Sequence, residues 1–281
     1  MSRIQVFTDS TCDLGLELRR RHAIEMVPLH VIFDDEDYLD GVNLQAEDLF
    51  RKVESGGKLP KTAAPSPGEF IAAFEPYIEQ GCDIVYVGLS SKLSATFQNA
   101  CLAAEHFPSG RIVCVDSLNL ATCVGLLALK AARAAEAGLP LADIERMLLD
   151  ARERLEAEFV IDTLDYLHKG GRCSALASFI GGLLKIRPVV KVVDGGMILA
   201  SKIRGKREKA LEQLLANLIE QRERIEDDFI FLEHASALED ALALKARLEN
   251  EFGLQVELAE AGCVISSHCG PQTVGILYCR S

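Results

Sequence analysis

The stretch that most constrains the fold lies at residues 82–100, where an apolar run passes through a short polar turn towards a helical pattern. Residues 82–87 are apolar and rich in β-branched side chains, which predicts a buried strand. Hydroxyl groups follow at Ser90, Ser91 and Ser94. Because the first N–H groups of a helix have no intrahelical partner and its dipole is positive there, the turn predicts a site for an anion. The pattern leaves open that Ser94 only caps the helix.

Strand and helix patterns alternate through the first 158 residues. Apolar strand patterns at residues 3–8, 24–33 and 111–115 are interleaved with helical patterns, the longest of which run over residues 120–137 and 141–156. This alternation predicts an N-terminal α/β domain, residues 1–158, with a largely parallel sheet. Ligands bind at the carboxyl ends of such strands.

The remaining residues, 159–281, have a different pattern. They predict an apolar helix at 174–185, a hairpin over 188–203 and three further strands near 229–232, 255–258 and 273–277. We expect a second, α+β domain with a mixed or antiparallel sheet. A chain of 281 residues with 49% hydrophobic content can bury the cores of both domains.

Composition excludes several classes of protein. The net charge of -12 argues against a general nucleic-acid binder, which needs a basic face for phosphates. The apolar helix near residues 118–129 is too short to cross a bilayer, and residues 1–10 lack a secretory leader, so we expect a cytoplasmic protein without an integral membrane segment. Nine cysteines without a C-x-x-C pair suggest neither a disulfide framework nor a zinc ribbon. We expect no metal and no cofactor, because nucleotide-binding glycine motifs are also missing.

Several short motifs together resemble the DegV family, the bacterial fatty-acid-binding subunits of a fatty acid kinase. The central one is SSKLSAT at residues 90–96, and TDSTCDL opens the chain at residues 8–14. The order and spacing of the motifs over nearly the whole chain make the resemblance specific. The others are KTAAPSP at 61–67, VDS at 115–117, LHKGGR at 167–172 and HCGP at 268–271.

The resemblance implies a two-domain DegV-like fold with one long-chain fatty acid in a tunnel between the domains. Thr62 and Ser94 would hydrogen-bond the carboxylate, with the N–H groups of Ala95 and Thr96 and the side chain of His268 close by. His268 lies between polar residues and is expected in a loop. A separate ATP-binding kinase subunit would convert the presented carboxyl group to an acyl phosphate, so no catalytic residue is expected in this chain.

Basic residues concentrate between positions 169 and 209, where the only acidic residues are Asp194 and Glu208. In an acidic protein such a cluster would steer an acidic partner. Arg172 and Arg204 are the candidates for contact with the kinase subunit or with a phosphate. A purely solvated charge run remains an alternative.

The chain departs from the family pattern at four positions. The family generally has Ser-Gln where this chain has Ala63 and Ala64, and glycine where it has Ala95 and Gln272. These changes alter the polar network expected after Thr62 and add a methyl group beside the carboxylate site.

Two other functions compete with this reading. Ser90, Asp116 and His268 occur in the chain order of an α/β-hydrolase triad, but Lys92 stands where the nucleophile turn needs a second glycine. A lipid carrier or sensor that works without any kinase is also compatible with the sequence.

Overall fold

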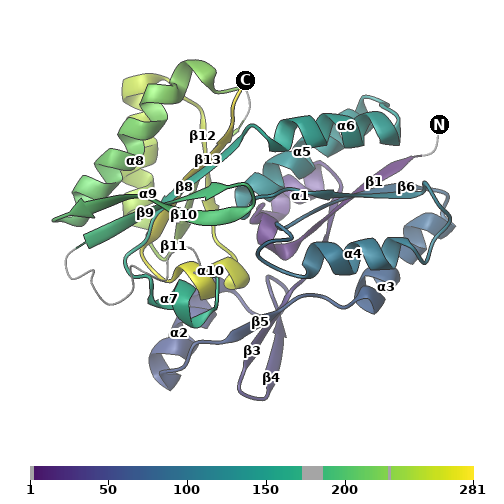
Figure 1. Ribbon diagram of the computed structural model, residues 1–281, viewed down its shortest axis with the longest axis horizontal. Helices are drawn as coiled ribbons and strands as arrows, with labels where there is room; N and C mark the ends of the chain where they lie inside the picture. Colours follow the sequence, from purple (N-terminus) through teal and green to yellow (C-terminus); the bar gives the residue numbers. More distant parts are fainter. Residues whose placement is uncertain (1–2, 173–185, 227–228) are drawn as a thin grey trace.

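The computed structural model describes residues 3–172, 186–226 and 229–281 of the chain (Figure 1). Its first sheet has four strands, all parallel, in the order β2-β1-β6-β7. This arrangement confirms the parallel α/β sheet expected in the N-terminal part. The strands are β1 (Ile4–Asp9), β2 (Ile24–Val27), β6 (Asp83–Gly88) and β7 (Ile112–Asp116).

Helices cover both faces of the parallel sheet, as its buried strands require. One face is covered by α3 (Pro67–Glu79) and α4 (Thr96–Ala104), around a core that includes Phe70 and Tyr86. Helix α3 begins at Pro67 because Ser66 and Glu69 cap each other's backbone N–H groups and proline suits the first helical position. The other helices of this part are α1 (Leu16–Arg21), α5 (Thr122–Glu136) and α6 (Leu141–Arg152).

The second sheet has six strands in the order β10-β9-β8-β13-β11-β12. Only β11 and β12 pair in parallel, so the sheet is mixed, as expected for the C-terminal part. Helices α8 (Arg207–Gln221) and α9 (Leu238–Phe252) pack on it with the second core. The strands are β8 (Leu155–Val160), β9 (Ile186–Val193), β10 (Gly196–Arg204), β11 (Ile230–Ala235), β12 (Val256–Glu260) and β13 (Thr273–Cys279).

A small third sheet, β4-β3-β5, was not predicted from the sequence. The expectation of one strand over residues 24–33 was wrong, because the chain breaks at Pro28, which has no N–H for a ladder. The N–H of Leu29 instead donates to Ser10 Oγ at 3.0 Å. The elements here are β3 (His30–Phe33), β4 (Glu36–Leu39), β5 (Lys61–Ala63) and the neighbouring α2 (Ala46–Gly56).

The chain between the two large sheets also differs from the prediction. The helix expected over residues 141–156 ends at Arg152, and Leu155 begins β8. The expected division between residues 158 and 159 falls inside this strand, and the two-domain boundary stays a prediction. The helix expected at 174–185 lies outside the described residues.

Helix α5 packs against both large sheets. It contacts β1 on one side and β13 on the other, and most of its side chains are buried. This position explains the apolar character of the sequence around it, which reflects a central core helix. None of the helices in the described part of the chain has the length and apolar content needed to span a membrane.

Candidate functional site: a pocket between the sheets

A pocket lies where the three sheets meet α5 and the C-terminal helix α10 (Cys263–Cys269). It holds about 860 Å³ of atom-free space, its open mouth included. Most of its wall is apolar and comes from both halves of the chain, including Leu29, Leu89, Leu120, Phe159, Met197 and Leu277.

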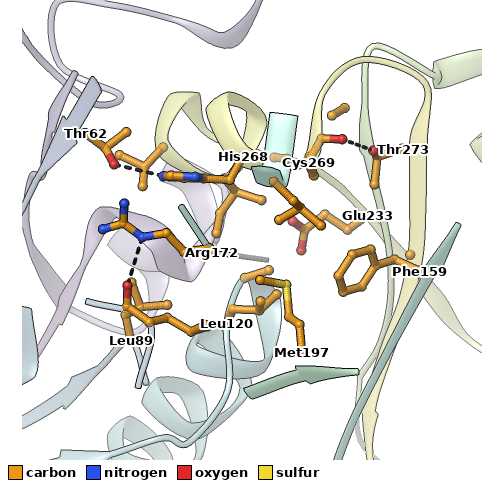
Figure 2. Close-up of a pocket in the computed structure, with 18 of the residues that line it drawn as sticks. Thr62, Leu89, Leu120, Phe159, Arg172, Met197, Glu233, His268, Cys269 and Thr273 are labelled. Carbon is orange, nitrogen blue, oxygen red and sulfur yellow. Dashed lines mark hydrogen bonds between the residues drawn. The ribbon is translucent and has the colours of Figure 1, made fainter. Parts of the chain in front are cut away.

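Thr62, Arg172 and His268 lie on one side of the pocket, and Glu233 and Thr273 lie towards the other side (Figure 2). Thr62 comes from β5, Ser94 from the turn before α4, Arg172 from the segment after α7 (Asp165–Lys169), and His268 from α10. Thr62 Oγ1 and His268 Nε2 are 2.9 Å apart and hydrogen-bonded. Figure 2 shows Phe159 and Met197 on the opposite side of the pocket. The structure therefore brings together three residues expected at one site, Thr62, Ser94 and His268, and adds Arg172.

His268 lies in a helix, so the expectation of a loop was wrong. The N–H groups of Cys263 and Val264 at the start of α10 donate to the carboxylate of Asp40, at 2.7 and 3.4 Å. This cap comes from a residue more than two hundred positions away, so no local sequence signal marks the helix. Burial, together with the positive charge of Arg172, lowers the pKa of His268 to about 4. Its imidazole is therefore neutral at pH 7.

Arg172 hydrogen-bonds to backbone carbonyls. Its Nε donates to the carbonyl of Leu93 at 3.2 Å and its Nη1 to that of Gly170 at 2.7 Å. Within residues 3–172, 186–226 and 229–281 no carboxylate is paired with this guanidinium. A half-buried arginine bound only by neutral carbonyls leaves positive charge available to an anion in the pocket.

Ser94 both caps the helix and lines the pocket. Its Oγ accepts from the N–H of Thr96 at 3.3 Å and shares a hydrogen bond with Thr96 Oγ1 at 2.8 Å. Thr96 is fully buried, whereas Ala95 is exposed, and neither belongs to the described lining of the pocket. The N–H of Thr96 is thus already partnered within the protein.

Ala63 and Ala64, two of the departures from the family pattern, line the pocket directly after Thr62. At the fourth departure, Gln272 has a φ of 61°, a left-handed conformation in which glycine is favoured. Its Nε2 donates to the carbonyl of Ser236 at 2.6 Å. Ala63 and Ala64, by contrast, make the pocket wall next to Thr62 apolar.

Arg204 is exposed at the end of β10 and is not among the described lining residues. Three other residues of the basic cluster are paired with acids outside it: Arg187 with Asp162, Lys191 with Glu156, and Arg207 with Asp240. The cluster is therefore less positive than its sequence suggests. Arg204, Lys206 and Lys209 of this cluster are exposed.

The three residues of the hydrolase hypothesis do not form a triad. Ser90 is fully buried, and its hydroxyl donates to the carbonyl of Gly195 in the β9–β10 turn at 2.8 Å. The carboxylate of Asp116 accepts from backbone N–H groups of Ser91 and Leu118. His268 is bonded to Thr62. Ser90 thus joins the central turn to the second sheet.

Sequence reasoning missed Glu233, which lines the pocket from β11. Figure 2 shows its side chain pointing into the pocket. The sequence contains a signal for Glu233, because this charged residue directly follows the apolar residues 230–232. A carboxyl group in a buried strand is rare enough to mark a special position.

The fold and the pocket define a class: a protein with a mostly apolar pocket, one side of which carries a cation and hydroxyl groups. The sequence profile described as an uncharacterised protein of the DegV family matches residues 3–281. This chain belongs to the DegV family, and the resemblance seen in its motifs is confirmed.

The relatives cover nearly the whole chain. A DegV domain-containing protein of Clostridium perfringens is 34% identical, over 99% of both chains. Among solved structures, one titled for fatty acid binding of a DegV family protein from Thermus thermophilus is 32% identical with a TM-score of 0.92, covering 99% of this chain and 100% of that one. The Bacillus subtilis DegV structure, titled a fatty acid binding protein, is 30% identical with a TM-score of 0.90, covering 100% of both chains.

Proposed function

We propose that this protein binds one long-chain fatty acid in the pocket, with the carboxylate at the side formed by Thr62, Ser94, Arg172 and His268. The observation that carries the proposal is the guanidinium of Arg172 beside two hydroxyl groups at one side of an apolar pocket. The related Thermus and Bacillus structures are described as fatty-acid-binding, which supports the same ligand class.

The two ends of the ligand would contribute differently. Each buried CH₂ group contributes about 0.8 kcal/mol, so a long acyl chain supplies on the order of ten kcal/mol before the losses of association. A buried carboxylate is costly unless it is hydrogen-bonded and paired. The acyl chain therefore sets the affinity, while the polar groups set the orientation.

His268 would act as a neutral hydrogen-bonding group. Because its pKa is lowered to about 4, the positive charge that faces the carboxylate at pH 7 comes from Arg172. The hydrogen bond of His268 to Thr62 holds the hydroxyl in place. The carboxylate would then be bound by the positively charged Arg172 and by the neutral side chains of the other three residues.

We propose further that the protein presents the carboxylate to a separate ATP-dependent kinase subunit in the cytoplasm. A carboxylate oxygen would attack the γ-phosphorus of ATP and release ADP, which gives an acyl phosphate for phospholipid synthesis. This chain would hold and orient the acid, and catalysis would reside in the partner. The exposed Arg204, Lys206 and Lys209 would face acidic residues of that partner.

Mass spectrometry of lipid extracted from the purified protein tests the ligand. We expect a long-chain fatty acid at near one equivalent in the wild type. A Thr62→Val, Ser94→Ala double variant should retain at least tenfold less, because a hydrogen bond to a charged group contributes about 1.5–3 kcal/mol. Ser55→Ala, which removes an exposed hydroxyl on α2, is the matched control. Equal fatty acid in the double variant and the control would contradict the assignment.

The kinase step separates a presenting subunit from a stand-alone carrier. The loaded protein is mixed with a purified DegV-associated kinase subunit and ATP, and hydroxylamine trapping detects the acyl phosphate. We expect product with the wild type and a lower initial rate with an Arg204→Glu, Lys206→Glu variant that still holds its lipid. Binding without any acyl phosphate would favour the carrier.

A further inference from the structure

Three carboxyl groups form a buried cluster beside the pocket: Asp13, Asp40 and Glu233. They lie in different parts of the chain, and their exposed fractions are 8%, 1% and 5%. The hydrogen bonds they accept within the described residues come from backbone N–H groups, hydroxyls and thiols rather than from a cation. Such a cluster is tolerated only where it is well bonded or retains protons.

Two members of the carboxyl cluster hold the start of α10, the helix that carries His268. Asp13 Oδ1 accepts from the N–H of Gly262 at 2.9 Å, next to the bonds from Cys263 and Val264 to Asp40. The fit is close, because a Cβ on Gly262 would lie 2.9 Å from Asp13 Oδ1 and 3.2 Å from Asp40 Oδ1. A seven-residue helix is weak alone, so these bonds decide where it begins.

The third member joins this helix to α5. Glu233 Oε2 accepts from the N–H of Thr122, the first residue of α5, at 3.0 Å. The carboxyl groups of Asp13 and Glu233 are both buried and lie close enough for each to affect the pKa of the other. Asp13 Oδ2 is buried and accepts no hydrogen bond within the described residues. Two carboxylates cannot bond to each other, so a hydrogen bond between Asp13 and Glu233 requires a proton on one of them.

The surroundings favour retention of that proton. Burial, with the negative charge of Glu233 next, raises the pKa of Asp13 well above its usual value. Burial also raises the pKa of Glu233, and the two groups titrate as a pair. One proton shared by the pair leaves a single negative charge facing the N-terminus of α5.

We propose that Asp13 and Glu233 share one proton and act as positioning residues for His268, so that loss of this proton loosens the start of α10 and weakens fatty-acid binding. The inference rests on the proposed function for its link to the ligand. Two adjacent buried carboxylates repel each other, and the separation would pull Asp13 away from Gly262. The imidazole of His268 lies farther along the same helix and would lose its alignment with Thr62.

The imidazole and the thiols near the pair have pKa values outside the pH range of the experiment. The imidazole of His268, with a pKa of about 4, is already neutral in the range of the experiment. Burial raises the pKa of the Cys269 thiol to about 12 and raises the pKa values of two neighbouring thiols as well. The groups that face the pair are Asp40, Cys123, Cys263 and Cys269.

The test measures the Kd of cis-parinaric acid between about pH 6 and pH 10, below the pKa of the buried thiols. In the wild type we expect Kd to rise about tenfold per pH unit above the pKa at which the pair loses its proton. Glu233→Gln and Asp13→Asn should flatten this slope, because an amide donates the hydrogen bond without a titrating proton. A flat wild-type profile, or an unchanged slope in both variants, overturns the proposal.

Glu158→Gln is the matched control. Glu158 is also a carboxyl group whose pKa is raised by burial, and it accepts from Asn217 at 2.8 Å, but it is not among the described lining residues of the pocket. We expect the wild-type slope to persist in this variant. A flattened slope here would show that any partly buried carboxyl has the same effect.

Amide hydrogen exchange of the protein without ligand separates this inference from the proposed function. Protection at the N–H groups of Gly262, Cys263 and Val264 should fall with rising pH in the wild type, beyond the intrinsic rate, and should hold in Glu233→Gln. If no fatty acid binds at any pH but protection still falls, the proposed function fails and the positioning role stands. If fatty acid binds and protection does not change, the positioning role fails.

Discussion

Replacing Gly170 with alanine is expected to displace His268 without straining the backbone. Gly170 follows α7 with a φ of -73°, a conformation that alanine adopts freely. The added Cβ would lie 2.8 Å from His268 Cε1 and closer still to Nδ1. Ordinary contacts begin at 3.4 Å, so Cε1 must retreat by at least 0.6 Å and the nearer Nδ1 by about twice as much.

That retreat is enough to weaken the bond to Thr62. The hydrogen bond between Thr62 Oγ1 and His268 Nε2 is 2.9 Å long, and a ring displaced by this amount cannot keep the present distance and angle. We expect the variant to be destabilised by about 1–3 kcal/mol through overpacking. Its fatty-acid Kd should rise about two- to tenfold, since a lost bond of this kind contributes about 0.5–1.5 kcal/mol.

Urea unfolding measures the stability, cis-parinaric acid titration measures Kd, and the imidazole NMR signals of His268 report its position. Gly56→Ala is the control, because a Cβ at this helix end has no neighbour within 4 Å. It should leave Kd unchanged. Unshifted His268 signals together with a wild-type Kd in Gly170→Ala would refute the reasoning.

Three further predictions concern pH, pocket length and backbone conformation. Burial lowers the pKa of His30, but hydrogen bonds to Asp37 and Glu69 outweigh it and raise this pKa above its usual value. The stability that its positive charge adds is therefore present below about pH 6.5 and is lost as pH rises through the raised pKa. Urea unfolding at about pH 6 and pH 9 should show a larger loss of stability with rising pH in the wild type than in His30→Gln. Met197→Trp, which fills the side of the pocket opposite Thr62, should shift extracted fatty acids to shorter chains, and an unchanged mass distribution would place the acyl tail elsewhere. Gln272→Gly should increase the free energy of unfolding by about 0.5–1 kcal/mol, seen as a higher urea midpoint, because glycine adopts a φ of 61° without penalty. A lower midpoint would show that the hydrogen bond to Ser236 outweighs the backbone strain.

The sequence predicted those elements whose signals are local. The buried runs of β1, β6 and β7 need only neighbouring residues, and they were found where expected. The hairpin turning near residues 194–196 was also predicted, as β9 and β10. Hydrophobic period and turn chemistry are enough for such elements.

The elements that were missed depend on distant partners. Helix α10 is rich in serine, cysteine and β-branched residues, and its cap is supplied by Asp40 from far away in the sequence. Leu155 fits a helical face as well as it fits the first position of β8, since it is buried in either case. Pro28 separates two strands that pair in different sheets, which a propensity pattern cannot distinguish.

The site was predicted chiefly through family motifs. Thr62, Ser94 and His268 are far apart in the sequence, and residue patterns alone gave no reason to place them together. The structure adds the neutral state of His268, which follows from burial and from Arg172, both of them tertiary effects. Glu233 was visible as a charge directly after an apolar run, but its neighbour Asp13 was not.

The placement of α5 has a consequence for how the chain unfolds. This helix contributes buried side chains to the packing of both large sheets. If either sheet unfolded, apolar side chains of α5 would become exposed to water. Heating should therefore melt the whole molecule in one cooperative step, and a fragment that stops before β8 should precipitate through the exposed flank of α5.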